Sequence, residues 1–374
     1  MPISCFEKII EETCHKKYIS GVVVCMASSD TRFEWSGAAG NLRVDDQYFI
    51  ASTTKLYVTA IIFNFRQQGL IRLDDPLALY FSPWEIKGIH HYKGHDFSTE
   101  ITIRQLLSHT SGLGDYFQGK AKHVAGSLEK SVVAGEDQSW NFEDVIRMTR
   151  EIAPEFKPGQ SGKAFYSDTN FQLLGKVIEN VSGKSLSSVM KELIFQPLGL
   201  RCTYLYQDES DKRPVSLNYK DEHLWIPKAM SSFGADGGIV STTNESMRYL
   251  QAFFKGELFP VEYLDEMSDW NRIFFPLEYG LGVSRFKLPR IFSPFKPFPE
   301  LIGHSGLSGA FAFFCPERSL YMTGTVNQVA RPGTSFKLML ELIEAYDKSG
   351  LSRTRLNKQE KRIPESPAEI HVDY

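Results

Sequence analysis

The chain has 374 residues, 42% of them hydrophobic and 23% charged, with 42 Lys plus Arg against 45 Asp plus Glu. At about 150 residues per domain, this length predicts one large or two interleaved domains. The formal net charge of −3 at pH 7 offers no basic field to a polyanion, which argues against a nucleic-acid partner. The longest apolar runs are far shorter than the roughly 20 residues that span a bilayer, so no membrane-spanning segment is predicted.

Two features of the sequence report on cellular location. The N-terminus carries Glu7 early and has neither a basic region nor an unbroken apolar stretch, so no secretory signal is expected. The five cysteines are scattered without C-x-x-C spacing, which favours reduced thiols over a disulfide framework. We therefore expect a cytoplasmic protein.

Three predicted elements open the chain and three close it. Apolar spacing and turn residues predict first a helix and then a hairpin, over residues 5–16, 21–27 and 31–36. A second hairpin and a final helix are predicted over residues 309–315, 319–326 and 336–348. Since elements of this kind bury their apolar faces against one another, the two chain ends are expected to form one layer of sheet and helix.

The middle of the chain is predicted to be mostly helical. Helical periods occur over residues 102–108, 141–151 and 171–181, and again over residues 244–255. We predict an α/β fold of the α+β kind, in which helices flank an antiparallel sheet and a mostly helical domain is inserted. The predicted parts are a discontinuous α/β domain, the insert and a polar tail, formed by residues 1–72 with 231–350, 73–230 and 351–374.

A serine motif stands between the first predicted sheet elements and the insert. Ser52 and Lys55 fit the pattern S-x-x-K, which places a hydroxyl and an amine on one helix face. The same spacing also occurs by chance at Ser127, Ser188, Ser284 and Ser293. Only Ser52 follows a strand-like apolar segment and opens a strongly apolar helical run.

That setting predicts a buried lysine beside an activated serine. Desolvation would lower the pKa of Lys55, and the N-terminus of the helix would favour a developing alkoxide on Ser52. The alternative is that Ser52 is only the N-cap of the helix, because serine is a preferred capping residue.

Two further segments favour a catalytic role for Ser52 over a role as only the N-cap of the helix. Tyr166 and Asp168 lie two apart just before a predicted helix, and His304, Ser305 and Gly306 lie just before the predicted strand 309–315. With S-x-x-K, these segments resemble the serine β-lactamase and penicillin-binding-protein-like family, in its branch of class C β-lactamases, DD-peptidases and esterases. Members of that branch carry S-x-x-K, Y-x-N and K/H-x-G in this order. Similar flanking segments occur at residues 101–113, 165–175, 196–200 and 237–242.

The resemblance covers roughly residues 5–348 and implies a catalytic role for each motif. Ser52 would be the nucleophile, and Lys55 with Tyr166 would shuttle its proton. The backbone amides of Ser52 and Leu307 would form the oxyanion hole, beside the element that contains His304. Acyl transfer needs these parts, namely an activated hydroxyl, a base within reach and two donors for the tetrahedral oxygen.

Two residues depart from the strongest β-lactamase pattern. Asp168 stands where Y-x-N has asparagine, and its carboxylate would favour a charged Lys55, which moves base work onto Tyr166. Alternatively, Asp168 only caps a helix or bonds a loop. His304 stands where many β-lactamases have lysine, and a histidine with a pKa near ~6.5 is mostly neutral at pH 7 and anchors a carboxylate weakly. Alternatively, His304 is a packed histidine without a chemical role.

The substrate-binding prediction adds the residues around these motifs. We expect Asp168, Ser305 and Gly306 to contact substrate. The segment 289–299 contains four prolines and three phenylalanines, which excludes a regular strand. We hypothesise that these aromatic residues wall an apolar pocket beside the histidine motif, namely Phe292, Phe295 and Phe298.

Other chemistries are less well supported. An α/β-hydrolase needs G-x-S-x-G, but the segment around Ser305 has Leu307 in place of the final glycine. His91 and His95 are four apart, yet neighbouring glycines argue against a helix that would hold a metal. We predict neither a metal nor another cofactor.

The sequence therefore predicts a serine hydrolase that forms an acyl-enzyme on Ser52. The expected partner is a small ester, amide or peptide substrate, as for an esterase, amidase or D-amino-acid peptidase. A β-lactamase or DD-carboxypeptidase is the alternative enzyme, although the absence of an export signal argues against a cell-wall substrate. A non-catalytic protein that binds penicillin or peptide is the alternative from another class. The sequence does not predict an oligomeric state.

Overall fold

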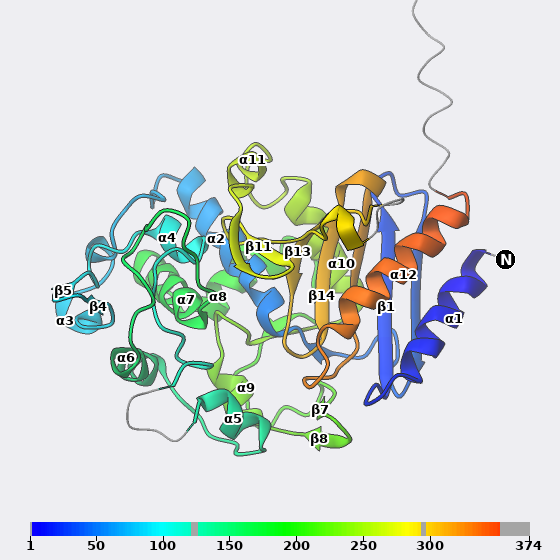
Figure 1. Ribbon diagram of the computed structural model, residues 1–374, viewed down its shortest axis with the longest axis horizontal. Helices are drawn as coiled ribbons and strands as arrows, with labels where there is room; N and C mark the ends of the chain where they lie inside the picture. The colour runs from blue at the N-terminus through cyan, green and yellow to red at the C-terminus, as the bar shows by residue number, and fades with distance from the viewer. Residues whose placement is uncertain (1, 121–125, 293–296, 352–374) are drawn as a thin grey trace, which may run out of the picture.

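The computed structural model describes residues 2–120, 126–292 and 297–351. One large antiparallel sheet is covered by helices on both faces, and the mostly helical middle of the chain lies beside it (Figure 1). This arrangement confirms the predicted fold class. No helix in the described part of the chain combines the length and hydrophobicity that a bilayer crossing requires.

The large sheet has eight strands, and both chain ends contribute to it. Its order is β10-β11-β12-β13-β14-β15-β1-β2, with antiparallel neighbours throughout. The strands are β1 (Gly21–Ser28), β2 (Glu34–Gly40), β10 (Asn271–Phe274), β11 (Leu277–Tyr279), β12 (Ser284–Phe286), β13 (Leu301–Ser305), β14 (Ala310–Cys315) and β15 (Leu320–Thr325). The hairpins that sequence periodicity predicted are β1–β2 and β14–β15, and they meet where β15 pairs with β1.

Strands β10 to β13 were not predicted from periodicity. His304 and Ser305 form the end of β13, and they pair with β14, the strand that they were expected to precede. The four strands are only three to five residues long, which is too short for a period of two to stand out.

The central strand β1 is buried on both faces. Val22, Val24 and Met26 belong to the apolar cluster beneath α1 and α12, whereas Val23 and Cys25 belong to the cluster on the α10 side. Successive side chains of a strand point to opposite faces, so an unbroken apolar run is what a strand between two helical layers requires. In Figure 1, α1 and α12 lie next to each other across one face of the sheet.

The helices fall into the layers that cover the sheet and the group beside it. The longer ones are α1 (Pro2–Cys14), α2 (Thr54–Gln67), α6 (Phe142–Glu151), α7 (Asp168–Ser182), α10 (Thr243–Phe254) and α12 (Thr334–Lys348). The shorter ones are α3 (Pro83–Ile86), α4 (Ile103–Leu107), α5 (Leu128–Val133), α8 (Leu186–Met190), α9 (Pro227–Ser232) and α11 (Tyr263–Met267). Predicted and observed ends agree most closely where a cap is present: Asn141 accepts a hydrogen bond from the amide of Asp144 at the start of α6.

Short elements complete the fold. A three-stranded sheet is formed by β3 (Tyr48–Phe49), β9 (Ile239–Ser241) and β6 (Tyr204–Leu205), and two small hairpins by β4 (His91–Tyr92) with β5 (His95–Asp96) and β7 (Leu217–Tyr219) with β8 (Glu222–Leu224). Single helical turns are η1 (Ala51–Thr53), η2 (Leu77–Leu79), the π-helical η3 (Lys191–Phe195), η4 (Arg290–Phe292) and η5 (Pro316–Arg318). The division into a discontinuous domain and an insert at residues 73–230 stays a prediction.

Candidate active site

Ser52 lies where β3 passes into α2. The amide of Ile50 donates to the carbonyl of Ile239 at 3.0 Å, which fixes the end of β3 against β9. Ala51 then has a φ of 46°, in the left-handed region that costs an L-residue roughly 1–2 kcal/mol. The turn sets Ser52 in η1, one step before α2. Its hydroxyl does not cap α2, because the N-cap residue is Thr53 and makes no side-chain cap.

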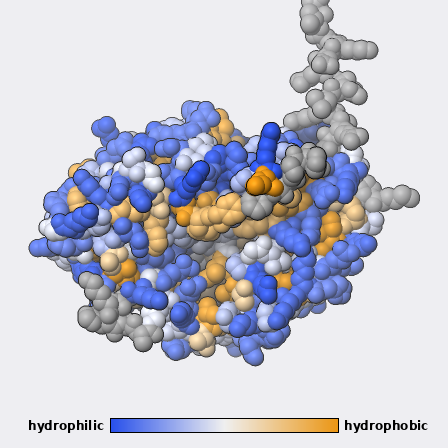
Figure 2. Space-filling model, in the orientation of Figure 1, coloured by the Kyte–Doolittle hydropathy of each residue, from blue (hydrophilic) through white to orange (hydrophobic). Residues whose placement is uncertain are grey.

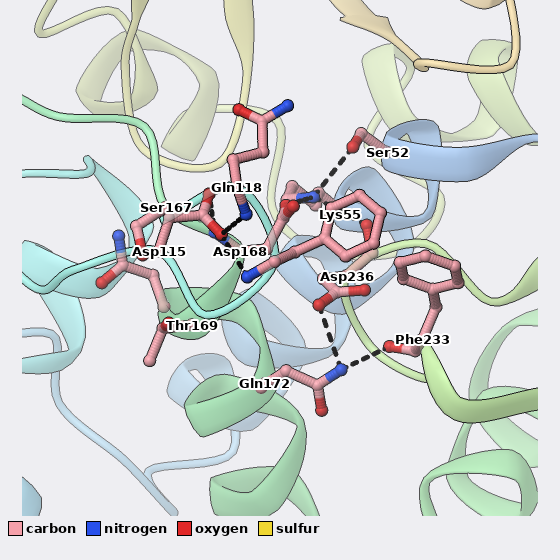
Figure 3. A network of polar contacts seen from close by, with 12 residues as sticks. Ser52, Lys55, Asp115, Gln118, Ser167, Asp168, Thr169, Gln172, Phe233 and Asp236 are labelled. Carbon is pink, nitrogen blue, oxygen red and sulfur yellow. Dashed lines mark hydrogen bonds and ion pairs between the residues drawn. The ribbon is translucent and has the colours of Figure 1, made fainter. Parts of the chain in front are cut away.

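Lys55 is completely buried and brings three polar groups together. Its Nζ atom lies 3.0 Å from Ser52 Oγ, 2.6 Å from the carbonyl oxygen of Asp236 and 2.7 Å from Asp168 Oδ1. Figure 3 shows the amine between the serine and the carboxylates. An ammonium has three N–H donors; two of them make the hydrogen bonds to Ser52 and to the carbonyl of Asp236, and the contact with Asp168 is an ion pair.

The protonation of Lys55 differs from the sequence prediction. Burial lowers its pKa, as expected, but attraction by the carboxylates of Asp168 and Asp236 outweighs burial, and the pKa is raised. The prediction that desolvation lowers the pKa of Lys55 is therefore wrong in its net direction. The opposite effect, in which the Asp168 carboxylate together with Asp236 favours the charged ammonium of Lys55, dominates over desolvation.

Asp168 is the first residue of α7, and the loop before it is anchored on both sides. Its amide donates to Asp115 Oδ2 at 3.2 Å, and the amide of Ser167 donates to His109 Nδ1 at 3.2 Å. Because other side chains satisfy these amides, the Asp168 carboxylate does not serve as a cap and is directed to Lys55.

Tyr166 stands over the amine at the wall of the site. Its half-buried ring has its centroid 5.2 Å from Lys55 Nζ and packs against His109 at 4.5 Å between ring centroids. Burial and the charge of Asp168 raise the pKa of Tyr166 well above its ordinary value, although a hydrogen bond with Ser52 opposes the rise. The phenol is therefore protonated at neutral pH.

The end of β13 closes the other side of the serine. A Cβ atom on Gly306 would lie only 3.3 Å from the amide nitrogen of Ser52 and 2.7 Å from the carbonyl of Ile50, so the absence of a side chain allows the close approach. The amide of Gly306 donates to Ala310, and no hydrogen bond from the amides of Ser52 or Leu307 to another described group is observed. Two unengaged amides beside one hydroxyl are what an oxyanion hole requires.

His304 is buried and neutral rather than a cationic anchor. Its Nδ1 atom lies 2.8 Å from the carbonyl oxygen of Ser305, which can only accept, so Nδ1 carries the proton. Its Nε2 atom, 3.0 Å from the hydroxyl of Tyr279, then accepts a hydrogen bond. Burial and the nearby charge of Lys55 lower the pKa of His304 to about 3.

The structure adds residues to the site that sequence motifs did not reveal. Asp236 is 1% exposed, and its Oδ2 atom accepts hydrogen bonds from Tyr116 at 2.8 Å and Gln172 at 3.0 Å. Figure 3 shows Gln172 holding this carboxyl group and the carbonyl of Phe233 together. Burial and the charge of Asp168 raise the pKa of Asp236 well above its ordinary value. The only signal in the sequence was its position directly before a segment, 237–242, that resembled the family.

A cavity of about 400 Å³ opens above Ser52. On the face shown in Figure 2, hydrophobic residues gather around a hollow near the middle. Among the described residues that line the cavity, none is lysine or arginine, and the carboxyl groups are those of Asp168 and Asp236. Tyr166, His304, Ser305, Gly306 and Leu307 all line it with Ser52.

Of the three phenylalanines hypothesised to wall the pocket, the described part of the structure tests only Phe298. Phe298 is 38% exposed and does not line the cavity, and Phe295 lies outside the described residues. Phe292 belongs to the single turn η4, and its side chain also lies outside the description. The walls instead contain Phe274 of β10 and Phe233 after α9.

Comparison with known proteins gives relatives with different substrates. The chain is 26% identical over 217 residues to the D-alanyl-D-alanine-carboxypeptidase/endopeptidase AmpH of Escherichia coli strain K12, a match of 58% of this chain and 51% of that protein. It is 27% identical over 241 residues to lovastatin esterase of Penicillium rubens, matching 59% and 57% of the two chains. Each match spans only about half of the relative's own length.

Solved structures show the same fold over a larger share of the chain. The D-stereospecific amidohydrolase from Streptomyces sp. is 26% identical, with a TM-score of 0.71 over 88% of this chain and 95% of that one. The D-amino acid amidase from Ochrobactrum anthropi SV3 is 22% identical, with a TM-score of 0.74 over 91% and 99%. A sequence model described as Beta-lactamase matches residues 6–343. With its three ordered motifs assembled around one cavity, the chain belongs to the Beta-lactamase family.

Proposed function

We propose that the protein is an acyl-enzyme hydrolase with Ser52 as nucleophile, and that it acts on esters or amides that lack a carboxylate. The observation that carries this proposal is the placement of Ser52 Oγ, 3.0 Å from Lys55 Nζ, on the floor of an apolar cavity that no described lysine or arginine lines. The serine attacks the carbonyl carbon, the amides of Ser52 and Leu307 stabilise the oxyanion, and water then hydrolyses the acyl-enzyme.

The cavity has two apolar walls that belong to different parts of the core. One wall packs with the cluster around α5, α9 and the β7–β8 hairpin, and includes Val132, Ile226 and Met230. The other comes from the β10–β11 hairpin and includes Phe274 and Leu277. A substrate with apolar groups on both sides of its carbonyl would bury each of them.

The position of Tyr166 distinguishes the two walls. A leaving group must take up a proton when its bond to the acyl carbon breaks, so it departs on the side of the proton donor. The ring of Tyr166 packs edge to face with Phe274 at 6.4 Å between ring centroids. We therefore assign the leaving group to the β10–β11 wall and the acyl group to the wall that contains Met230.

The absence of a lining cation among the described residues separates this proposal from its main alternative. A β-lactamase or DD-carboxypeptidase binds a substrate that carries a carboxylate, and an anion is stabilised by a nearby cation. Here His304 has a pKa of about 3 and the described cavity presents the carboxyl groups of Asp168 and Asp236. Relatives named as an amidase and an esterase are compatible with a neutral substrate.

The first experiment asks whether Ser52 forms an acyl-enzyme at all. We expect a fluorophosphonate to add one adduct to the wild type, visible in the intact mass, and none to Ser52→Ala. We also expect kcat/KM for 4-nitrophenyl butyrate to fall by about 1,000-fold or more in the variant. Ser188→Ala is the matched control, because Ser188 belongs to another S-x-x-K sequence and is exposed on α8, so this variant should label normally.

The second measurement separates the substrate classes. Phenyl and 3-carboxyphenyl esters of one acyl group differ only in a charge on the leaving group, and we expect the neutral ester to have the higher kcat/KM. A preference for the carboxylated ester, together with labelling of Ser52 by a fluorescent penicillin, would favour the carboxypeptidase or β-lactamase alternative. No adduct with either reagent would favour a binding protein.

A further inference from the structure

The geometry of Lys55 raises a question about where the serine proton goes. Its Nζ atom donates hydrogen bonds to Ser52 Oγ and to the carbonyl of Asp236, and it forms an ion pair with Asp168 Oδ1 at 2.7 Å. An ammonium in this arrangement has no lone pair with which to accept the hydroxyl proton. Lys55 must release one proton before it can act as a base toward Ser52.

Tyr166 does not remove the difficulty. To act as the base it would have to be a phenolate, which burial and the charge of Asp168 both disfavour. Of the groups that contact the amine, the carbonyl of Asp236 is not a base, whereas Asp168 carries a carboxylate whose Oδ1 atom lies 2.7 Å from the nitrogen.

We propose that Asp168 takes a proton from Lys55 as Lys55 takes the proton of Ser52, so that the three residues form a serine–lysine–aspartate relay. The Oγ–H bond breaks as the bond from Oγ to the acyl carbon forms, the proton joins Nζ, and Nζ passes one of its own protons to Oδ1. When the tetrahedral intermediate collapses, Tyr166 donates its proton to the leaving group. The proton held on Asp168 then passes through Lys55 to Tyr166 and restores its hydroxyl group.

In this relay Asp168 is a positioning residue, because it acts through Lys55 and not on the reacting atoms. Its own place is fixed: the amide of Asp168 is held by Asp115, and that of Ser167 by His109. The role differs from that of an aspartate behind a catalytic histidine, which orients the ring and does not itself become protonated. It depends on the proposed function, since it supplies the base for the same nucleophile.

Several other titratable groups face the relay, and any pH profile includes them. From the loop before α7, the 109–118 segment, β11, β13 and the loop before β9, these groups are Tyr166, His109, Asp115, Tyr116, Tyr279, His304 and Asp236. Because coupled groups titrate together, the apparent pKa values belong to the cluster. The test therefore compares variants and does not assign one limb of the profile to one residue.

The experiment uses a probe that isolates removal of the serine proton. A fluorophosphonate releases fluoride, which needs no proton from the enzyme, so its rate of addition to Ser52 reports on the relay alone. We expect Asp168→Asn to label about 100-fold more slowly at pH 7, because Lys55 must then lose a proton to water. For the same reason, the acid limb of the labelling profile, which is the pH range where the rate falls on acidification, should move to higher pH by at least about 1 unit. Asp168→Glu should retain an acid limb at the wild-type position.

One control variant and a check of folding keep the outcomes separate. Asp144→Asn also removes a carboxylate from the first turn of a helix, that of the half-buried Asp144 of α6, and should leave both rate and limb unchanged. The relay would be overturned, and the proposed function left intact, if the wild type labels and Asp168→Asn labels equally fast. The same conclusion would follow if the acid limb of Asp168→Asn does not move. A wild type that forms no adduct on Ser52 would overturn the proposed function itself. Circular dichroism and Tm of each variant establish that it is folded.

Discussion

The two faces of β1 and the floor beneath Ser52 are equally buried but are stabilised in opposite ways. Between the sheet and α1 and α12, side chains such as Phe6, Phe313 and Leu342 exclude water and have no polar group to satisfy. Beneath Ser52, a fully buried Lys55 is surrounded by oxygens, and Asp168 pairs with it. Apolar burial stabilises the first region roughly in proportion to area, whereas the second depends on every charge keeping its partner.

The comparison shows that the site, unlike the apolar region, contains buried carboxyl groups that make the stability of the fold depend on pH. Asp115 has a pKa of about 7, because burial and the charge of Asp168 raise it above its ordinary value. A raised carboxyl pKa means that folding is favoured by the protonated form and that stability is lost as pH rises toward 7. Beneath α12, Phe313 and Leu342 carry no titratable group, so substitution of these residues is expected to act through packing alone.

The largest effect on stability is expected from breaking the buried ion pair. Lys55→Met leaves Asp168 without its cation and should lower the free energy of unfolding by about 3–5 kcal/mol. The double variant Lys55→Met/Asp168→Leu removes both charges and should recover most of that loss. Urea denaturation at pH 7 measures both values.

Phe313→Ala provides the reference from the apolar region. It should also cost about 3–5 kcal/mol, but no second substitution at a polar partner can restore it. A double variant at Lys55 and Asp168 that is as unstable as Lys55→Met would contradict the contrast between the two regions.

A smaller effect, on activity and not on stability, is expected at the boundary between sheet and site. In Gly306→Ala the new Cβ atom would lie 2.7 Å from the carbonyl of Ile50 and 3.3 Å from the amide of Ser52. Displacing one oxyanion donor should lower kcat for 4-nitrophenyl butyrate by about 100-fold, with little change in KM. Gly333→Ala is the control, since a Cβ there meets no atom within 4 Å; equal losses in both variants would argue against a special role for Gly306.

The smallest effect concerns acid stability. His304 has a pKa of about 3 in the fold and an ordinary value near ~6.5 when unfolded. Its contribution is therefore complete above pH 6.5 and is lost as pH falls toward 3, because the unfolded chain binds the proton first. Between pH 6.5 and 5 the wild type should lose about 2 kcal/mol more stability than His304→Gln. The exposed His223 offers the comparison: His223→Gln should follow the wild type over this pH range.

Much of the fold and part of the site could be predicted from local pattern. Long amphipathic helices and the two hairpins at the chain ends follow from apolar periodicity, since one buried face must recur every 3.6 or 2 residues. Ser52, Lys55, Tyr166 and His304 were found because their motifs occur in order along the chain. The short strands β10 to β13 carry too few residues for a period to show.

The sequence by itself determined the fold class, through apolar periodicity, and the nucleophile motif, through the order of three motifs that resembles the family. Only the tertiary structure decided the charge on Lys55. Asp236 lies 181 residues away from it along the chain and accepts a hydrogen bond from its amine, and with Asp168 it outweighs desolvation. The same holds for the pocket wall, which Phe274 forms and Phe298 does not. A pKa or a cavity depends on which charges and surfaces meet in space, and residues far apart in sequence make most of those contacts.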